Sequence, residues 1–361
     1  MPPHIISIGE ALVEVMRPDV RQPLDRTGDF HGPFASGAPA IFAVAAARLG
    51  ASVGFIGGIG DDAFGRLMRA RLEAEGVDAT GLQVAPGRST GVAFVAYASD
   101  GGREFVFHLR HAAAGAMDAG QIDPAYLADV HWLHLSGSTL ALNAASQAAC
   151  QRALDLSLAA GGRLSFDPNL RPELMPLEQA RQVLAPFVEA ADLLLPTAAE
   201  ARALTGTTDD DAAAKALLAG RDRIVALKRG AAGCTLYVKG ERFDAPGLAV
   251  DEVDPTGAGD CFNAACLIGL EAGWPPERVA RFASAAGALA VTRKGPMEGA
   301  PTFKQVQAVL SGSTMVTTQP ARPIVKSRPS MTQKPGFQEK NLVSRPPDSP
   351  ANPQTQEEIH L

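Results

Sequence analysis

The chain has 361 residues, of which 46% are hydrophobic and 20% are charged, and its formal net charge is −6. This composition is typical of soluble globular proteins, and the net charge gives no electrostatic footprint for nucleic acid, which leaves only a local basic patch open. No apolar run approaches the roughly eighteen residues of a membrane-spanning helix, so we expect no membrane partner and a cytoplasmic location. The four cysteines form no CxxC pair, which favours buried thiols over a zinc site or a disulfide framework.

Short apolar strands alternate with Ala- and Leu-rich helices along most of the chain. Strands are predicted at 4–9, 52–57, 130–136, 163–167, 192–196 and 223–228, and helices at 39–49, 62–75, 144–160, 178–190, 198–204, 211–219, 259–271 and 276–292. This alternation predicts a mostly parallel sheet with helices on both faces, in which ligands bind at the carboxyl ends of the strands. Because Glu10 and Glu14 interrupt the N-terminal apolar stretch and no basic region precedes it, we expect a first strand there rather than a signal peptide.

One internal segment interrupts the alternation, and the end of the chain differs in composition. Residues 91–108 have the pattern of two period-2 strands around the turn SDGG, which predicts a β-hairpin. We therefore expect one α/β domain over residues 1–312, with lid pieces at about 10–37 and 88–112 that exclude water from a site. Residues 313–361 are rich in proline and show no sustained periodicity, so a disordered tail is expected there.

The sequence DPTGAGDCFNAA, residues 254–265, is the densest local signal in the chain. Gly257 and Gly259 allow torsions in which successive N–H groups point at one anion, and the apolar run after them predicts a helix whose positive end faces the same point. The lysine and hydroxyl of a GxxxxGK[ST] phosphate loop are absent. Asp260 stands at the helix start, where it is either a base for a hydroxyl that attacks a phosphoryl group or an ordinary N-cap.

DPTGAGD resembles the C-terminal signature D-T-x-G-A-G-D of the ribokinase-like (PfkB) carbohydrate kinase family, with Pro255 in place of the usual threonine. Further motifs keep the family's order through most of the chain. The resemblance implies a three-layer α/β/α fold with a mostly parallel central sheet and a small β-hairpin lid. It also implies that Asp260 is the catalytic base, and that the amides of Gly257, Ala258 and Gly259 form an anion hole for the transferring phosphoryl group.

The same resemblance assigns residues to ATP, Mg²⁺ and a monovalent cation. FDPNLRPEL is similar to the family's D-P-N-x-R segment, which places Asn169 and Arg171 beside the phosphates. LLPTAAEA occupies the N-x-x-E position, so Glu200 is expected to organise Mg²⁺ through water, with Thr197 replacing the usual asparagine. The residues that resemble a nucleotide border are Lys228, Gly230, Gly233 and Ser284, and those that resemble a K⁺ site are Asp254, Thr256 and Gly295.

The sugar-binding side departs from the family pattern. ASGAPAIFAVAAARLG corresponds to the signature G-G-A-P-A-N, but Ser36 replaces the first glycine and Ile41 replaces the asparagine that commonly hydrogen-bonds a sugar hydroxyl. Glu14 matches the family's sugar-binding aspartate at the end of the first strand and is one methylene longer. The residues predicted to approach the substrate are Glu14, Gly37, Ala38, Arg110 and Asp260.

These motifs are most similar to family members that act on ketoses and 2-keto-3-deoxy sugar acids, which implies transfer of the γ-phosphoryl group of MgATP to a primary hydroxyl of a small sugar. A nucleoside kinase of the same fold and a non-catalytic sugar-binding regulator stay open as alternatives. So does a dinucleotide-dependent dehydrogenase, since Gly58, Gly60 and Ala63 satisfy GxGxx[GA] after a strand. The apolar hairpin also allows a homodimer through the lid.

Overall fold

The computed structural model describes residues 3–98, 102–218 and 220–312. The predicted tail, 313–361, lies outside the described residues, as do residues 99–101 of the hairpin turn. Within the described part, the larger sheet has nine strands. In spatial order they are β13 (Glu241–Ala245), β12 (Cys234–Val238), β11 (Ile224–Lys228), β10 (Leu193–Leu194), β9 (Arg163–Asp167), β8 (Trp132–Ser136), β1 (Ile5–Ile8), β4 (Val53–Ile59) and β5 (Leu82–Val84).

Neighbouring strands from β11 to β5 pair in parallel, whereas β12 and β13 are antiparallel. The central strands are buried on both faces, which explains why their sequences are continuous apolar runs rather than alternating ones. The predicted mostly parallel sheet is therefore confirmed. The antiparallel edge strand β13 was not predicted from periodicity.

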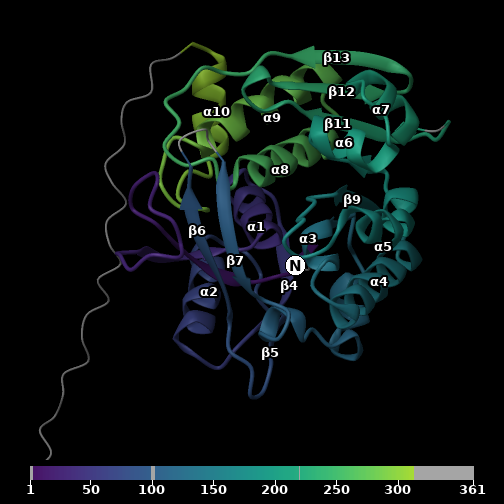
Figure 1. The fold of residues 1–361 in the computed structure, drawn as a ribbon. Helices are drawn as coiled ribbons and strands as arrows, with labels where there is room; N and C mark the ends of the chain where they lie inside the picture. The colour runs from purple at the N-terminus through teal and green to yellow at the C-terminus, as the bar shows by residue number, and fades with distance from the viewer. Residues whose placement is uncertain (1–2, 99–101, 219, 313–361) are drawn as a thin grey trace, which may run out of the picture. The chain divides into compact units, whose positions relative to one another are not determined.

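Helices cover both faces of this sheet, so the domain has three layers (Figure 1). One hydrophobic core lies under α1 (Ala38–Arg48), α2 (Ala63–Ala74), α8 (Ala258–Glu271), α9 (Pro276–Ala290) and α10 (Phe303–Leu310). The other lies under α3 (Gly137–Leu140), α4 (Ala144–Ala159), α5 (Leu177–Ala190), α6 (Ala198–Thr205) and α7 (Asp210–Leu218). Short 3₁₀ turns occupy Ala113–Gly115, Ala119–Gln121, Pro124–Leu127 and Gly230–Ala232.

The eight predicted helices begin and end within two residues of their predicted bounds. Polar N-caps fix some of these starts: Asp62 accepts a hydrogen bond from the Gly65 amide, and Asn143 accepts one from the Ser146 amide. The short helices α3 and α10 were not predicted. None of the described helices is long and apolar enough to cross a membrane.

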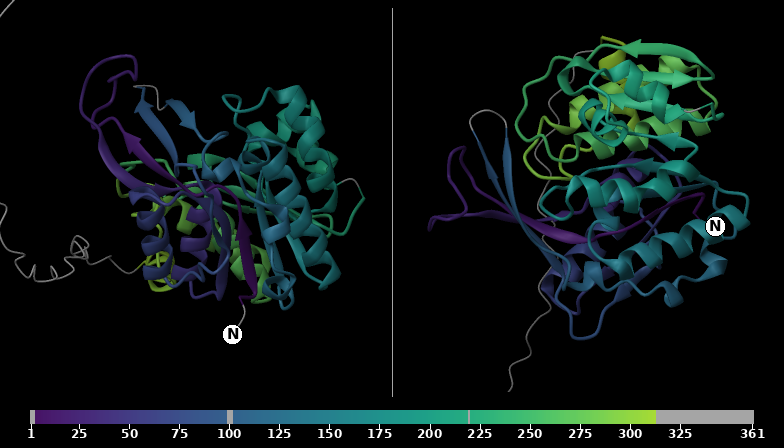
Figure 2. Two further views of the ribbon diagram at one scale, coloured as in Figure 1. Left: turned by 90° about the horizontal axis from the view of Figure 1, so that it is seen from below. Right: turned by 45° about the vertical axis from the view of Figure 1, so that its right-hand side comes forward.

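A second, four-stranded sheet forms the lid, in the order β3 (His31–Ser36), β2 (Leu12–Met16), β6 (Gly91–Tyr97) and β7 (Arg103–His108). Figure 2 shows these strands standing away from the helix-covered layers. The predicted hairpin is β6–β7, which pairs antiparallel, but β2 and β6 pair in parallel. One expectation is corrected: Glu14 does not end the first strand but lies in β2, because β1 pairs with β4 and β8 whereas β2 pairs with lid strands.

The carboxyl ends of the parallel strands carry a concentration of polar side chains. Asp167 ends β9, Lys228 ends β11, and Glu10 follows β1 by two residues. Parallel strands bring these ends to one edge of the sheet, where ligands bind in folds of this type. The lid strands β2, β3 and β7 contribute to the same place, which positions the candidate site between the two sheets.

Candidate active site

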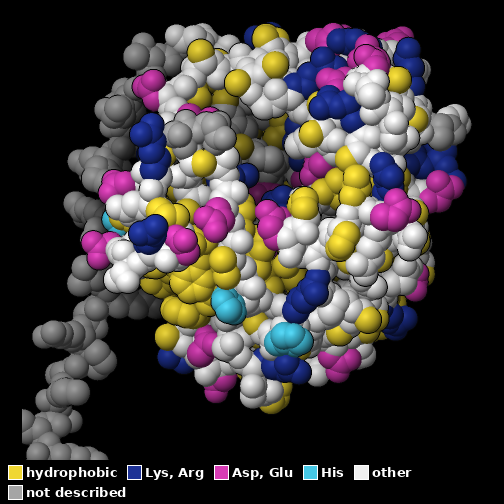
Figure 3. Space-filling view, in the orientation of Figure 1, with side chains coloured by type: hydrophobic (Ala, Val, Ile, Leu, Met, Phe, Trp, Pro, Cys, Tyr) yellow, Lys and Arg dark blue, Asp and Glu magenta, His cyan; other side chains and the backbone are white. Residues whose placement is uncertain are grey.

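A cavity of about 230 Å³ lies between the carboxyl ends of the core strands and the lid. Figure 3 shows the surface hollowed in this region, with acidic and basic side chains around the hollow. The predicted site residues that line the cavity are Glu14, Gly37, Ala38, Asn169, Arg171, Glu200, Lys228, Thr256, Gly257, Gly259 and Asp260. Residues far apart in the sequence are thus brought together by the fold.

The glycine turn before α8 has the conformation that its sequence predicts. Gly257 is the N-cap of α8 and has φ 85°, in the left-handed region that favours glycine. A Cβ at this position would meet the carbonyl oxygen of Pro296. Helix α8 is fourteen residues long and begins at the cavity. The positive end of its dipole therefore faces the cavity together with the amides of the turn. This arrangement can bind an anion with backbone groups alone.

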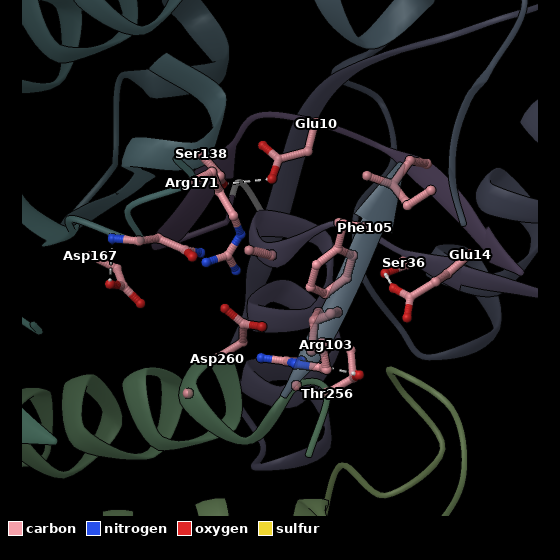
Figure 4. A pocket seen from close by; sticks show the side chains of 18 of the residues that line it. Glu10, Glu14, Ser36, Arg103, Phe105, Ser138, Asp167, Arg171, Thr256 and Asp260 are labelled. Atoms are coloured by element: carbon pink, nitrogen blue, oxygen red, sulfur yellow. Dashed lines mark hydrogen bonds between the residues drawn. The ribbon is translucent and has the colours of Figure 1, made fainter. Parts of the chain in front are cut away.

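Asp260 lies in the first turn of α8 and points into the cavity (Figure 4). Although the side chain borders the cavity, protein atoms surround it, and this desolvation raises the pKa of Asp260 to about 7. The charge of Asp167 raises the pKa further, while Lys228 and Arg171 lower it. A carboxylate with a pKa near neutrality is suited to take a proton from a hydroxyl.

Two residues of the D-P-N-x-R segment border the same space. Asn169 is buried, and its Nδ2 donates to Ser136 Oγ at 3.0 Å. Arg171 Nη1 donates to the Leu170 carbonyl at 3.1 Å, and its side chain extends into the cavity (Figure 4). A guanidinium here can neutralise anionic oxygens in a fixed, planar geometry.

Glu200 caps the start of helix α6, a structural role that its motif does not predict. Its Oε2 accepts from the amide and hydroxyl of Thr197, both at 2.8 Å, and the Thr197 hydroxyl accepts from the Glu200 amide, which completes a capping box for α6. Oε1 accepts from the Leu170 amide at 2.9 Å. The carboxylate borders the cavity with unused lone pairs, which fits a ligand that contacts Mg²⁺ through water.

Asp254, predicted at a cation site, joins the glycine turn to two other segments. Its Oδ1 accepts from the Tyr97 hydroxyl and the Thr256 amide, both at 3.0 Å, and its Oδ2 accepts from the Gly295 amide at 2.9 Å. Of the three residues predicted to hold K⁺, Asp254 therefore accepts from the backbone amides of the other two, Thr256 and Gly295. Among the described residues, no cluster of three His, Cys, Asp or Glu side chains suits a metal ion.

Glu14 lines the cavity on the lid side and is 4% exposed. Its Oε2 accepts from Ser36 Oγ at 2.9 Å, whereas its Oε1 has no hydrogen-bond partner among the described residues. Burial raises the pKa of Glu14 to about 7, although Ser36 and Arg103 lower it. Ser36, one of the departures from the family signature, thus orients Glu14.

The other departure, Ile41, packs beside the glycine turn. Its Cγ2 lies 3.3 Å from the position that a Cβ on Gly257 would take, and the side chain is 3% exposed. Gly37, with φ 110°, precedes α1, and a Cβ there would meet the Glu10 carbonyl oxygen. The segment therefore supplies shape and close backbone approach, and the sugar contact expected of Glu14 stays a prediction.

Three charged residues that line the cavity were missed: Glu10, Arg103 and Asp167, which ends β9. Glu10 is buried and accepts from Ser138 Oγ at 2.7 Å and from the Thr139 hydroxyl, and burial raises its pKa. Arg103, in β7, lines the cavity and donates to Thr256 Oγ1 at 3.5 Å (Figure 4). The period-2 pattern held a signal for Arg103, because Phe105 and Phe107 share its face of β7 and also line the cavity.

Seven predicted residues do not line this cavity. Asp254 and Gly295 are described above, and Ala258 lies in the first turn of α8. Arg110 borders a separate surface hollow and donates to the Leu174 carbonyl. Gly230 and Gly233 lie in the turn between β11 and β12. Ser284, on α9, donates to the Pro246 carbonyl at 3.1 Å, and a Cβ on Gly233 would meet the same Pro246 segment. Gly233 and Ser284 thus adjoin one segment, and their contact with a nucleotide stays a prediction.

Residues 3–303 match the pfkB family carbohydrate kinase profile. The chain belongs to this family. It is 33% identical over 320 residues to a probable fructokinase-4 from Arabidopsis thaliana, which covers 86% of this chain and 97% of the relative. This PfkB protein is a sugar kinase, so a non-catalytic regulator and a dehydrogenase are set aside.

Two solved structures share the fold and the sequence pattern. A provisionally named ribokinase II from E. coli, in complex with ATP and Mg²⁺, has a TM-score of 0.81 and 38% identity, covering 86% of this PfkB kinase and 99% of that chain. A fructokinase from Vibrio cholerae O395, bound to fructose, ADP and calcium, has a TM-score of 0.71 and 28% identity, covering 85% and 98%. The ribokinase-like fold predicted from the sequence is confirmed.

Proposed function

We propose that this kinase transfers the γ-phosphoryl group of MgATP to a primary hydroxyl of a small neutral ketose, with fructose as the first candidate. The observation that carries this proposal is the pairing of Asp260 with Glu14 across one cavity. Asp260 stands beside an anion-binding turn, and Glu14 presents an unpartnered acceptor on the opposite side. The fructokinase relatives support the same sugar class.

The charges around the substrate side favour a neutral sugar over a sugar acid. Glu10 and Glu14 border the cavity there and repel a substrate carboxylate in their ionised forms, while Arg103 on the same side donates to Thr256. Arg110, predicted to reach such a carboxylate, points to the Leu174 carbonyl instead. The unpartnered oxygen of Glu14 needs a donor, and a sugar hydroxyl supplies one.

The mechanism follows from the positions of the chain's own groups. Asp260 takes the proton of the primary hydroxyl as its oxygen attacks the phosphorus. The amides of the glycine turn and the guanidinium of Arg171 stabilise the negative charge on the transferring group. When bound, ATP supplies the phosphoryl group and Mg²⁺ neutralises its charge, with Glu200 as the residue that fits a water-mediated contact. The lid excludes water, which would otherwise compete as the acceptor.

The proposal is tested by ADP release from MgATP with a panel of neutral ketoses, 2-keto-3-deoxygluconate and nucleosides. The expected result is the highest kcat/KM with a neutral ketose, and a product whose phosphorus couples to a CH₂ group in NMR. The Asp260→Asn variant, purified in parallel, controls for contaminating kinases. A higher kcat/KM with the sugar acid or with a nucleoside would overturn the substrate assignment.

A further inference from the structure

A buried ion pair beneath the glycine turn has no part in the reaction as described above. The side chains of Lys228 and Asp167 are 10% and 4% exposed. Nζ of Lys228 lies 2.7 Å from Asp167 Oδ2 and 3.2 Å from Asn263 Oδ1. Asn263 Nδ2 donates to the same Asp167 oxygen at 2.6 Å. The three side chains form a closed ring of hydrogen bonds.

This ring includes Asn263 of α8, the helix that carries Asp260, and it lies close to Gly259. Asn263 is three residues after Asp260 on α8, nearly one helical turn, so it anchors the segment that carries the base. Nζ of Lys228 lies 3.6 Å from the position that a Cβ on Gly259 would take. Lys228 and Asp167 also line the cavity together with Asp260. The ring therefore fixes the first turn of α8 against the ends of β9 and β11.

Stability alone does not explain this arrangement. Removing two charges from water is costly, and well-packed apolar residues in place of a buried ion pair are often neutral or stabilising. The surrounding core could accommodate such residues. Phe166 and Leu227 directly precede Asp167 and Lys228, Cys266 lies three residues after Asn263 on α8, and all three are fully buried. A role at the neighbouring base accounts for the charges.

We propose that Asp167 and Lys228 are positioning residues that hold the first turn of α8 and balance the charge around Asp260. The inference rests on the proposed kinase reaction, in which Asp260 is the base. The two charges act on Asp260 in opposite directions, since Asp167 raises its pKa and Lys228 lowers it. The pair therefore offsets in part the effect that either charge alone would have on the base.

The charged groups that face Asp260 come from several elements. They are Asp167 from β9, Lys228 from β11, Arg171 after β9 and Glu10 after β1, and Arg103 from β7 lines the same cavity. Behind the pair, His134 stacks on Phe42 with 3.7 Å between ring centroids. Burial lowers the pKa of His134 to about 3, so this ring is neutral and leaves the balance unchanged.

The test measures the pH dependence of kcat/KM for fructose with saturating MgATP in Asp167→Asn, Lys228→Met and the double variant. Asp167→Asn leaves Lys228 unopposed, so the acidic limb of the profile is expected to move down by about one pH unit. Lys228→Met leaves Asp167 unopposed, and the limb is expected to move up by about the same amount. The double variant is expected to have a midpoint between those of the two single variants.

A purely structural role would lower kcat in all variants without moving the limb in opposite directions, and that result would overturn the proposal. Because breaking a buried pair leaves an uncompensated charge in the interior, Lys228→Met is paired with the double variant, which buries no unpaired charge. If Lys228→Met does not fold, a midpoint of the double variant above that of Asp167→Asn supports the proposal, and coincident midpoints contradict it.

The proposed reaction and the proposed ion-pair role are separable. Turnover of the wild-type enzyme is measured first, and its absence contradicts only the proposed function. The titration of Asp260 is then followed in the free enzymes by carboxyl ¹³C NMR, which needs no turnover. Opposite shifts of this titration in Asp167→Asn and Lys228→Met support the inference, and equal titrations in all variants contradict it.

Discussion

The two walls of the cavity are built in different ways. In the proposed reaction, the phosphoryl wall centres on one continuous segment, 254–260, whose amides and Asp260 face the cavity, with Arg171 beside it. The sugar wall takes side chains from β2, β3, β7 and the start of α1, and its polar contacts depend on pairs such as Glu14 and Ser36. The comparison teaches that a short stretch of chain predicts the type of reaction, whereas the proposed substrate depends on tertiary contacts.

The largest effect is expected from the base on the phosphoryl wall. Asp260→Asn removes the proton acceptor and keeps the shape of the side chain, so kcat is expected to fall by about 10³-fold while KM for the ketose changes little. Steady-state kinetics of ADP release checks this, with the melting temperature as a control for folding. Full turnover by this variant would contradict the role of Asp260.

The second largest effect is expected from a substitution that changes the conformation of the glycine turn and leaves Asp260 in place. In Gly257→Ala, the new Cβ would meet the Pro296 carbonyl at a φ of 85°, so we expect a stability loss of about 1–3 kcal/mol and a kcat lower by about 10²-fold. Gly240→Ala is the matched control, because Gly240 has φ 82° and nothing within 4 Å of a new Cβ. Denaturant unfolding and kinetics of both variants are compared. Equal losses of kcat would contradict a specific role for the turn.

On the sugar wall, binding is expected to change more than turnover. Glu14→Gln replaces an ionisable acceptor with an amide of the same size, and hydrogen bonds to charged groups contribute about 1.5–3 kcal/mol. KM for the ketose should rise about 10- to 100-fold, with kcat within a few-fold of wild type. Glu14→Asp keeps the charge and serves as the matched variant. A loss confined to kcat would place Glu14 on the phosphoryl wall instead.

The same residue predicts how stability depends on pH. The pKa of Glu14 is raised from 4.5 to about 7 in the folded protein, so between these values the folded state binds more protons than the unfolded state. The free energy of unfolding therefore falls as pH rises through this window. From pH 5 to pH 8, wild type should lose about 2 kcal/mol more than Glu14→Gln, as measured by urea unfolding. Parallel curves for the two proteins would contradict the raised pKa.

The smallest effect is expected outside both walls. Arg110 donates to the Leu174 carbonyl and does not line the cavity, so Arg110→Ala should change KM for a neutral ketose by no more than about twofold. Arg103→Ala is the informative partner, because Arg103 lines the cavity next to Thr256. A larger loss of kcat/KM for Arg110→Ala than for Arg103→Ala would reverse this assignment.

Sequence patterns predicted the elements and the glycine turn because both depend on short spacings, whereas the roles around the turn were implied by the family resemblance. The turn at Gly257 and the start of α8 follow from neighbouring residues, and the alternation of strands and helices predicts the layers. Glu10 was missed as a site residue because its partners, Ser138 and Thr139, lie in a distant segment. The side chain of Arg110 could not be placed from spacing, since no regular period continues after β7.

The bond between Tyr97 and Asp254 has a consequence for protein engineering. It joins the lid to the glycine turn across 157 positions of sequence, and Lys294 adds a second link at 2.8 Å to the Pro18 carbonyl. A lid transplanted from another kinase to change the substrate would arrive without these partners. We therefore expect substrate redesign in this scaffold to require that the hairpin, the loop that contains Pro18, and the 254–256 and 294–295 segments be exchanged as one unit.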